Sequence, residues 1–389
     1  MAEQQKNGAG HKGKREVVLV LQGGGALGAY HIGAYQALHE AGLEPDWVAG
    51  ISIGAINAAV IAGNKTGERL AALDSLWDSI SRPDETGRAL HGSWLRWYNQ
   101  YNVAEAMTLG QPNFWFPRIP SPLVLPPNSA DQASFYDTSP MLATLRSHVN
   151  FEGLGKAGYG RLSVGATRVD TGELVFFDSD DKQPLGPEHV LASGSLPPGF
   201  PATRVGEHHY WDGGCVSNTP LNAILDDKGS SDLLVFMIDL WNAEGRLPTS
   251  MDEVAWRQKQ IQYASRSAQI ETLCQVHNLR HSVAQHGLKS EAGGDSATAA
   301  AEGAVLDVPT RRIDIVHIIY HPSAEESSFS DAEFSRSSIA RRREAGLHDM
   351  KAALDHAPWS RPQLRAAPQS APAALHRLQA GAFTSLVPR

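Results

Sequence analysis

The feature that most constrains the fold is a double strand–helix alternation between residues 16 and 62, in which each strand runs into a glycine. Residues 16–21 are a short aliphatic run typical of a buried parallel strand. Residues 28–41 have the apolar spacing of a helix, residues 46–50 predict a second strand, and residues 51–62 predict a second helix. The alternation predicts a doubly wound α/β core, with helices covering a mainly parallel sheet.

Ser52 lies at the turn between the second predicted strand and the helix that follows it. The surrounding sequence, Gly50-Ile51-Ser52-Ile53-Gly54, fits G-x-S-x-G, and a strand–turn–helix context is that of a nucleophile elbow. A turn this sharp needs small flanking residues, and Gly50 and Gly54 meet that need. Ser52 could be a simple helix N-cap, but the helix N-terminus behind it would also favour developing negative charge.

A glycine-rich loop follows the first predicted strand. It contains Gly23, Gly24, Gly25 and Gly28. The loop fits G-x-G-x-x-G, so a Rossmann-type dinucleotide-binding oxidoreductase is the main alternative. That interpretation requires an acidic residue at the end of the second strand, whereas Asp46 lies at its start. In an esterase, the N–H groups of these glycines and of Ile53 would bind the oxyanion of a tetrahedral intermediate.

Asp212 follows a run with strand character and precedes Gly213 and Gly214, which let the chain turn sharply after the carboxylate. A serine nucleophile needs a base to accept its proton. An aspartate can act as that base when it lies close to the serine in a site that excludes water. Because Asp-Gly-Gly alone is common turn chemistry, the prediction depends on the other two motifs.

Together the three motifs resemble those of patatin-like phospholipases, in order and in spacing. Residues 192–201 are similar to the family's Ala-Ser…Pro…Phe-Pro segment, and Asn218 and Pro220 also fit. The resemblance covers residues 16–225. It implies a three-layer α/β/α fold, a Ser52–Asp212 dyad without histidine, and hydrolysis of lipid acyl esters without a metal or other cofactor. It also implies an oxyanion loop formed by Gly23, Gly24, Gly25 and Gly28.

One position departs from the family pattern. Leu27 stands where the family's glycine loop often carries Arg or Lys. A cation there would support an anionic transition state or a lipid phosphate. Its replacement bears on phospholipid preference more than on ester hydrolysis, because the backbone N–H groups are unchanged. A non-catalytic lipid-binding protein of the same fold is a further alternative.

The resemblance and the composition predict four parts of the chain. Residues 1–15 are expected to be a flexible tail, and residues 16–228 the patatin-like catalytic domain. Residues 229–357 are expected to form a mostly helical extension that packs on the core or completes it. Residues 358–389, rich in Pro and Ala, are expected to be disordered, and residues 291–303 are expected to form a mobile loop.

Charge and composition bear on partners and compartment. A net charge of −8 argues against nucleic-acid binding, which usually needs a basic surface. Two cysteines are too few for a disulfide framework, and neither a secretory signal nor a membrane-spanning run is visible. We therefore expect a cytoplasmic enzyme with weak peripheral membrane contact. Phe114, Trp115 and Phe116 could form an apolar wedge for that contact, or could pack in the core.

Three pairs of histidines offer other sites: His208 and His209, His277 and His281, and His317 and His321. Neighbouring residues of a strand point to opposite faces, so at most one of the first pair shares the side of Asp212. The second pair has metal-ligand spacing on a predicted helix but lacks a third ligand, so no metal site is predicted. The third pair would complete a Ser–Asp–His triad, which remains an alternative to the dyad.

Overall fold

A mainly parallel sheet forms the centre of the molecule. The computed structural model describes residues 15–84, 86–124, 129–265, 267–291, 311–323, 325–360, 373–379 and 382–386. Within them the main sheet is ten-stranded, in the order β12-β11-β10-β9-β1-β2-β5-β8-β7, with β6 paired to β5. The strands that run parallel to their neighbours are β1 (Glu16–Leu21), β2 (Trp47–Gly50), the start of β5 (Arg161–Arg168), β9 (Leu233–Asp239), β10 (Ile313–Ile319) and β11 (Ala373–Gln379). The antiparallel strands are β6 (Leu174–Asp178), β7 (Thr203–Val205), β8 (His208–Asp212) and β12 (Ala382–Leu386).

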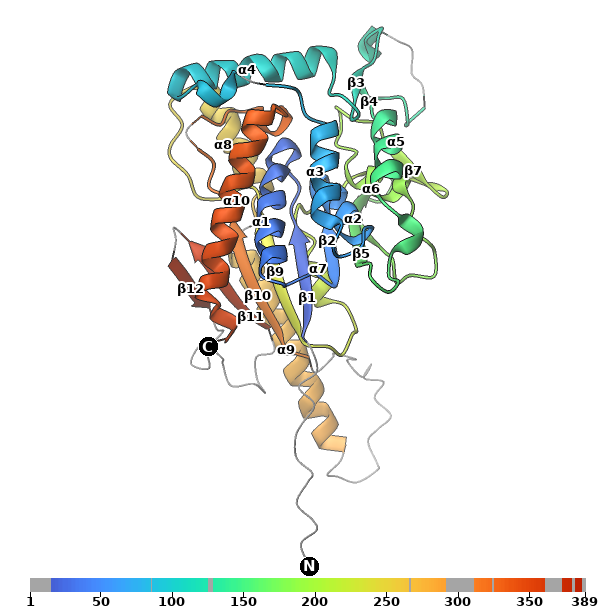
Figure 1. The fold of residues 1–389 in the computed structure, drawn as a ribbon. Coiled ribbons are helices and arrows are strands. Elements are labelled where there is room, and N and C mark those ends of the chain that lie inside the picture. Colours follow the sequence, from blue (N-terminus) through green and yellow to red (C-terminus); the bar gives the residue numbers. More distant parts are fainter. Residues whose placement is uncertain are drawn as a thin grey trace, which may run out of the picture.

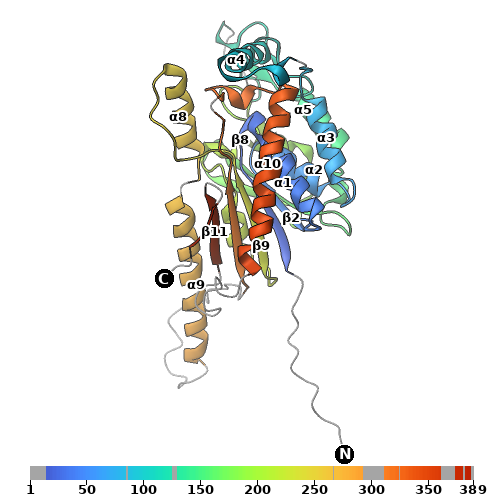
Figure 2. The same cartoon turned by 60° about the vertical axis from the view of Figure 1, so that its left-hand side comes forward.

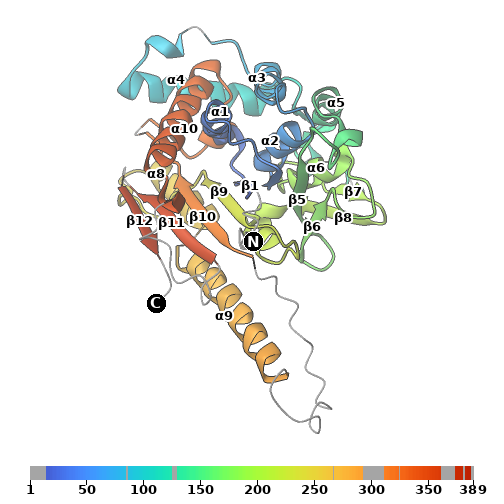
Figure 3. The same ribbon diagram turned by 60° about the horizontal axis from the view of Figure 1, so that its bottom comes forward.

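Helices cover both faces of this sheet, as Figures 2 and 3 show. One face carries α1 (Ala29–Glu40), α2 (Ile53–Ala62), α3 (Arg69–Ser79), α5 (Ser139–His148), α6 (Pro187–Ser193) and α10 (Arg336–His356). The other face carries α7 (Leu221–Leu225) and α9 (Ser267–Glu291). The predicted three-layer α/β/α fold is therefore confirmed.

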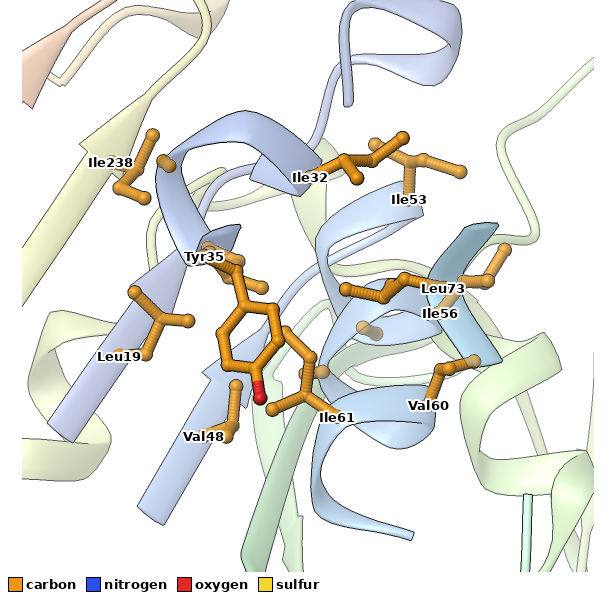
Figure 4. Close-up of a cluster of buried hydrophobic side chains, with 14 of the residues drawn as sticks. Leu19, Ile32, Tyr35, Val48, Ile53, Ile56, Val60, Ile61, Leu73 and Ile238 are labelled. Atoms are coloured by element: carbon orange, nitrogen blue, oxygen red, sulfur yellow. The ribbon is translucent and has the colours of Figure 1, made fainter. Parts of the chain in front are cut away.

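The alternation of side chains along β1 explains why two separate cores form. Leu19 and Leu21 belong to the core under α1 and α2, whereas Val18 and Val20 belong to the core under α7 and α9. Successive residues of a strand point to opposite faces, so an all-apolar strand must be covered twice. Figure 4 shows the first core, where Tyr35 of α1 lies beside strand and α2 side chains.

The chain beyond residue 228 continues the same sheet. β9 pairs with β1 along the whole length of β1, and β10 pairs with β9. The predicted late strand and the predicted helices at 250–287 and 336–354 are found as β10, α8 (Met251–Tyr263), α9 and α10. The mobile loop predicted at 291–303 lies outside the described residues, apart from Glu291 at the end of α9.

The expectation of a disordered tail from residue 358 is wrong where the structure describes that tail. Residues 373–379 and 382–386 form β11 and β12, and β11 pairs in parallel with β10. The side chains from Ala373 to Leu378 are buried. A Pro- and Ala-rich composition hides this strand, because its pairing with β10 and β12 depends on register, which composition does not reveal.

α10 lies along α1 in Figure 1, and two glycines bring the helices together. A Cβ atom on Gly346 of α10 would overlap the carbonyl oxygen of Tyr30, and one on Gly33 of α1 would overlap that of Arg343. The C-terminal helix is thus fitted to the first helix of the chain at backbone contact.

Gly346→Ala is expected to lower the free energy of unfolding by about 1–3 kcal/mol, since the added methyl forces two packed helices apart. Denaturant unfolding followed by circular dichroism measures it. Gly67→Ala is the matched control, because a Cβ atom there meets nothing within 4 Å. Equal stability of the two variants would show that α10 does not pack tightly on α1.

Candidate active site

Ser52 sits at a strained elbow between β2 and α2. Its backbone has φ 57° and ψ −126°, a conformation that side-chain-bearing residues rarely adopt. A Cβ atom on Gly50 would overlap the carbonyl oxygen of Gly54, and one on Gly54 would overlap that of Leu21. Both flanking glycines are therefore required for the chain to turn here, as the sequence predicts.

The register of the sheet places Asp212 at the level of Ser52. Gly50 at the end of β2 pairs with Val164 of β5, and Asp212 at the end of β8 pairs with Ala166 of the same strand. Ser52 and Asp212 thus both lie two residues beyond the Gly50–Val164 pair. Both residues line the same cavity, and the Ser52 hydroxyl acts on the Asp212 carboxyl group to lower its pKa. β5, which lies between β2 and β8 in the sheet, thus brings together two residues that are 160 positions apart in the chain.

The end of α6 ties both residues in place. The N–H of Ser52 donates to Ser193, to its carbonyl oxygen at 3.2 Å and its Oγ at 3.1 Å. The Ser193 hydroxyl in turn donates to the carbonyl oxygen of Gly165 at 2.6 Å. Two residues later, the carbonyl oxygen of Ser195 accepts from the N–H of Asp212 at 2.9 Å. The Ala-Ser segment noted in the sequence therefore holds the serine and the aspartate to one short stretch of backbone.

Asp212 is buried, with 2% of its surface exposed. Burial raises the pKa of its carboxyl group to about 6, because a buried anion loses its hydration, and hydrogen bonds from Ser52 and from the N–H of Gly214 act in the opposite direction. The Gly214 N–H lies 2.7 Å from Oδ1. The carboxylate therefore accepts a hydrogen bond from the turn that follows it and lines the same cavity as Ser52.

The glycine-rich loop presents N–H groups beside Ser52. The carbonyl oxygen of Gly23 accepts from Nδ2 of Asn218 at 2.9 Å and from Nε1 of Trp241 at 2.8 Å. The C=O and N–H groups of a trans peptide point in opposite directions. These two hydrogen bonds to the Gly23 carbonyl oxygen therefore direct the N–H of Gly24 away from Asn218 and Trp241. Among the described residues, the N–H groups of Gly24, Gly25 and Ile53 have no hydrogen-bond partner.

Gly28 has a different place from the other loop glycines. It ends the short 3-10 helix Gly25–Gly28, and a Cβ atom there would lie 2.7 Å from the side chain of Ile53. Gly28 does not line the cavity that contains Ser52, whereas Gly23, Gly24 and Gly25 do. Its geometry fits close packing between α1 and α2 and not contact with a substrate.

A single apolar cavity of about 320 Å³ holds these groups together. Its walls are formed mainly by aromatic and aliphatic side chains: Ile53, Ile56, Met107, Phe114, Trp115, Tyr136, Leu196, Pro197, Pro198, Phe200, Trp241, Tyr263, Phe329 and Phe334. Ser52, Asp212 and the three loop glycines are among its polar lining. An apolar cavity with a few convergent polar groups is typical of a site for an apolar ligand.

The aromatic run at 114–116 belongs mainly to this cavity. Phe114 and Trp115 are each 7% exposed and pack on Phe200 and Phe334. Phe116 alone is exposed. Of the two alternatives left open by the sequence, packing in the core holds for Phe114 and Trp115, whereas only Phe116 could form part of a protruding wedge.

Several residues of the site could not be predicted from local motifs. Gln22 is fully buried, and its Oε1 accepts from the N–H groups of Leu240 and Trp241 at 2.7 and 3.1 Å. It thereby fixes the end of β9 beside the glycine loop. Lys259 of α8 and Asp331 line the cavity from the C-terminal part of the chain and form an ion pair, with Nζ 2.8 and 2.9 Å from the two carboxylate oxygens.

The histidine pairs lie outside this cavity. Nε2 of His317 is 2.8 Å from Oδ2 of Asp239, deep between β9 and β10. His277 and His281 are buried on α9, on the far face of the sheet. Among the described residues no cluster of three or more His, Cys, Asp or Glu could hold a metal ion.

A sequence profile described as patatin-like phospholipase matches residues 19–225. The chain belongs to the patatin-like phospholipase family. A second profile, described as patatin phospholipase, matches residues 261–366, so both parts of the chain have counterparts among patatin phospholipases.

Individual relatives of this patatin-like chain are distant or match over short stretches. Neuropathy target esterase sws of Drosophila melanogaster is 57% identical over 42 residues, which cover 11% of this chain and 3% of the fly protein. VipD from Legionella pneumophila has 17% identity and a TM-score of 0.37, covering 88% of this chain and 67% of its own. Human GIVD cytosolic phospholipase A2 has 9% identity and a TM-score of 0.38, covering 88% and 59%.

Burial of Asp212 should cost this patatin-like protein stability at high pH. Its pKa lies above the usual value for Asp, so the folded state loses stability as pH rises from about 4 to about 6, and above pH 6 the loss is complete at about 3 kcal/mol. Asp212→Asn is expected to melt a few degrees above the wild type at pH 8 and at nearly the same temperature at pH 4. A wild type that is more stable than the variant at pH 8 would mean that the carboxylate is not buried.

Proposed function

We propose that this protein hydrolyses carboxylic esters of lipids, with Ser52 as nucleophile and Asp212 as base. The observation that carries the proposal is that a strained elbow serine and a buried aspartate line the same apolar cavity. A strained, glycine-flanked backbone at a serine is characteristic of nucleophiles that must stand clear of the sheet.

The acylation step uses groups that already surround Ser52. As Oγ attacks the carbonyl carbon of the ester, Asp212 accepts the hydroxyl proton. The negative charge passes to the former carbonyl oxygen, which the N–H groups of Gly24, Gly25 and Ile53 are available to bind. The intermediate collapses by breaking the bond to the leaving alcohol, and Asp212 returns the proton to the departing oxygen.

The deacylation step repeats the sequence with water. Asp212 accepts a proton from a water molecule that attacks the acyl–Ser52 ester, and the same N–H groups receive the second oxyanion. The fatty acid leaves and the proton returns to Ser52. A carboxylate with a pKa of about 6 is a stronger base than an ordinary aspartate and is still ionised at neutral pH.

Two alternatives are less compatible with the described residues. A dinucleotide would need open space over the glycine loop, but a Cβ atom on Gly25 would overlap the carbonyl oxygen of Asp331, so the loop is already covered there. β2 also runs into Ser52 without an acidic residue at its end. A lipid-binding protein without turnover would have the same cavity, and reactivity of Ser52 separates it from an esterase.

Ser52→Ala and Asp212→Asn are each expected to lower turnover of a short-chain chromogenic ester by at least about a thousandfold. Fluorophosphonate should label the wild type at Ser52 and leave Ser52→Ala unlabelled. Below pH 6 the wild-type kcat/KM should fall about tenfold per pH unit as Asp212 takes up a proton. His321→Ala, an exposed position, is the control for a triad and should keep full activity. A wild type without labelling or turnover would favour the lipid-binding alternative.

We also propose that the acyl ester is uncharged near the glycine loop. Of the described residues that line the cavity, Lys259 is the one cation, and it is already paired with Asp331. Leu27 is fully buried, so it brings no charge to the loop. An anionic head group would therefore approach Asp212 and Asp331 without a free cation to balance it.

Asp331→Asn should release Lys259 while keeping the size of the side chain. The ratio of turnover on lysophosphatidate to turnover on a monoacylglycerol of the same chain length is expected to rise several-fold over the wild-type ratio. Lys259→Met should leave monoacylglycerol turnover within about twofold. A wild type that prefers lysophosphatidate would contradict an uncharged substrate.

A further inference from the structure

Helix α4 (Gly92–Leu109) exposes a stripe of aromatic residues. Its outward stripe carries Trp94, Trp97 and Tyr101, which are 72%, 63% and 56% exposed. Its inward side buries both apolar and polar side chains: Leu95, Asn99, Asn102, Val103 and Ala106. Surface helices of soluble proteins normally bury their apolar stripe and expose the polar one. An exposed aromatic stripe therefore indicates a surface that binds another molecule.

Polar side chains of α4 form hydrogen bonds to the rest of the protein. Nδ2 of Asn102 donates to Oε1 of Glu333 at 3.2 Å. On the flank of the helix, the hydroxyl of Tyr98 donates to Oδ1 of Asp84 at 2.9 Å. These bonds fix which side of α4 faces outward. The aromatic stripe is thus a set surface of the fold and not a helix turned the wrong way.

The stripe leads to the opening of the substrate cavity. α4 lies across one end of the sheet in Figure 1, and Met107, near its C-terminal end, lines the cavity and is itself 42% exposed. Trp94 and Met107 are thirteen residues apart, which is about 20 Å along a helix. Leu109 at the end of α4 is also exposed, and the chain after α4 adds exposed apolar side chains at Ile119, Leu123 and Val124.

The composition of this surface fits a lipid interface. Trp and Tyr are the residues that concentrate at the boundary between lipid and water, because their rings are apolar and their N–H or O–H groups remain hydrated. α4 carries one cation and one anion, Arg96 and Glu105, so it has no net charge with which to attract anionic lipid. Within the described residues no helix is both long and apolar enough to span a bilayer.

We propose that the outward stripe of α4, formed by Trp94, Trp97 and Tyr101, is the surface by which the protein docks on zwitterionic lipid, with the cavity opening facing the lipid. The proposal rests on the proposed function, because a lipid ester must pass from a membrane to Ser52. Docking places Met107 at the lipid boundary, so that an acyl chain can enter the cavity without crossing water.

The test is co-sedimentation of the full-length protein with phosphatidylcholine vesicles. Trp94→Gln/Trp97→Gln/Tyr101→Gln should reduce the partition coefficient at least tenfold. The matched control, Val276→Gln/Leu279→Gln/Val283→Gln, replaces three exposed apolar residues of α9 on the opposite side of the sheet and should bind as the wild type does. Wild-type binding should change less than twofold between 50 and 500 mM salt, because charge contributes little.

Turnover of a soluble short-chain ester separates this proposal from the proposed function. The α4 variant should keep full turnover on that ester and lose activity on vesicles. Vesicle binding through α4 in a protein without any turnover would support docking and overturn the esterase. If the triple variant melts early, Trp94→Gln alone replaces it, since Trp94 is the most exposed of the three. The proposal would be overturned if a stably folded α4 variant bound the vesicles as tightly as the wild type does. Binding that requires anionic lipid would also overturn it, as would a dimer that the α4 substitutions dissociate.

Discussion

The pairing of Ser52 with Asp212 in one cavity depends on a backbone conformation at Ser52 that only its surroundings can hold. The φ of 57° at Ser52 is disfavoured for any residue with a side chain, so neighbouring atoms must compensate for it. They do so by close approach, since Gly50 and Gly54 allow β1, β2 and α2 to come together at one point. The end of α6 then fixes the serine and the aspartate relative to each other. The rest of the architecture can be understood as support for this geometry.

That support comes from both halves of the chain. The carbonyl oxygen of Gly23 accepts hydrogen bonds from Asn218 and Trp241, which lie on opposite sides of the domain boundary expected near residue 228. Gln22 joins the ends of β1 and β9 in the same way, and Asp331 covers Gly25 from beyond β10. The C-terminal part therefore contributes side chains that line the cavity and hydrogen bonds that hold the glycine loop. The match of residues 261–366 to a patatin phospholipase profile agrees with that role.

How much of this could be predicted from the sequence depends on how local each signal is. The elbow at Ser52 and the Asp-Gly-Gly turn are short motifs whose glycines have specific steric duties, so they could be found without a structure. Lys259, Asp331 and Trp241 reach the cavity through long-range packing and carry no local signature. The sequence left open whether the aromatic run at 114–116 is buried, and it did not predict the strand at 373–379, because neither burial nor strand pairing follows from composition. α4 shows the converse, since its aromatic residues have the spacing of a core-facing stripe and lie outside.

The central position of β1 also determines when this protein can become active during its synthesis. β1 precedes the other described strands in the chain, but one of its two neighbours, β9, ends at residue 239, and the helix that covers α1 ends at residue 356. Until those segments leave the ribosome, one edge of β1 and one side of α1 remain unpaired. Ser52 would therefore stay without its braced glycine loop for most of translation. The order of synthesis therefore delays assembly of the Ser52 site until residues of the C-terminal part are available.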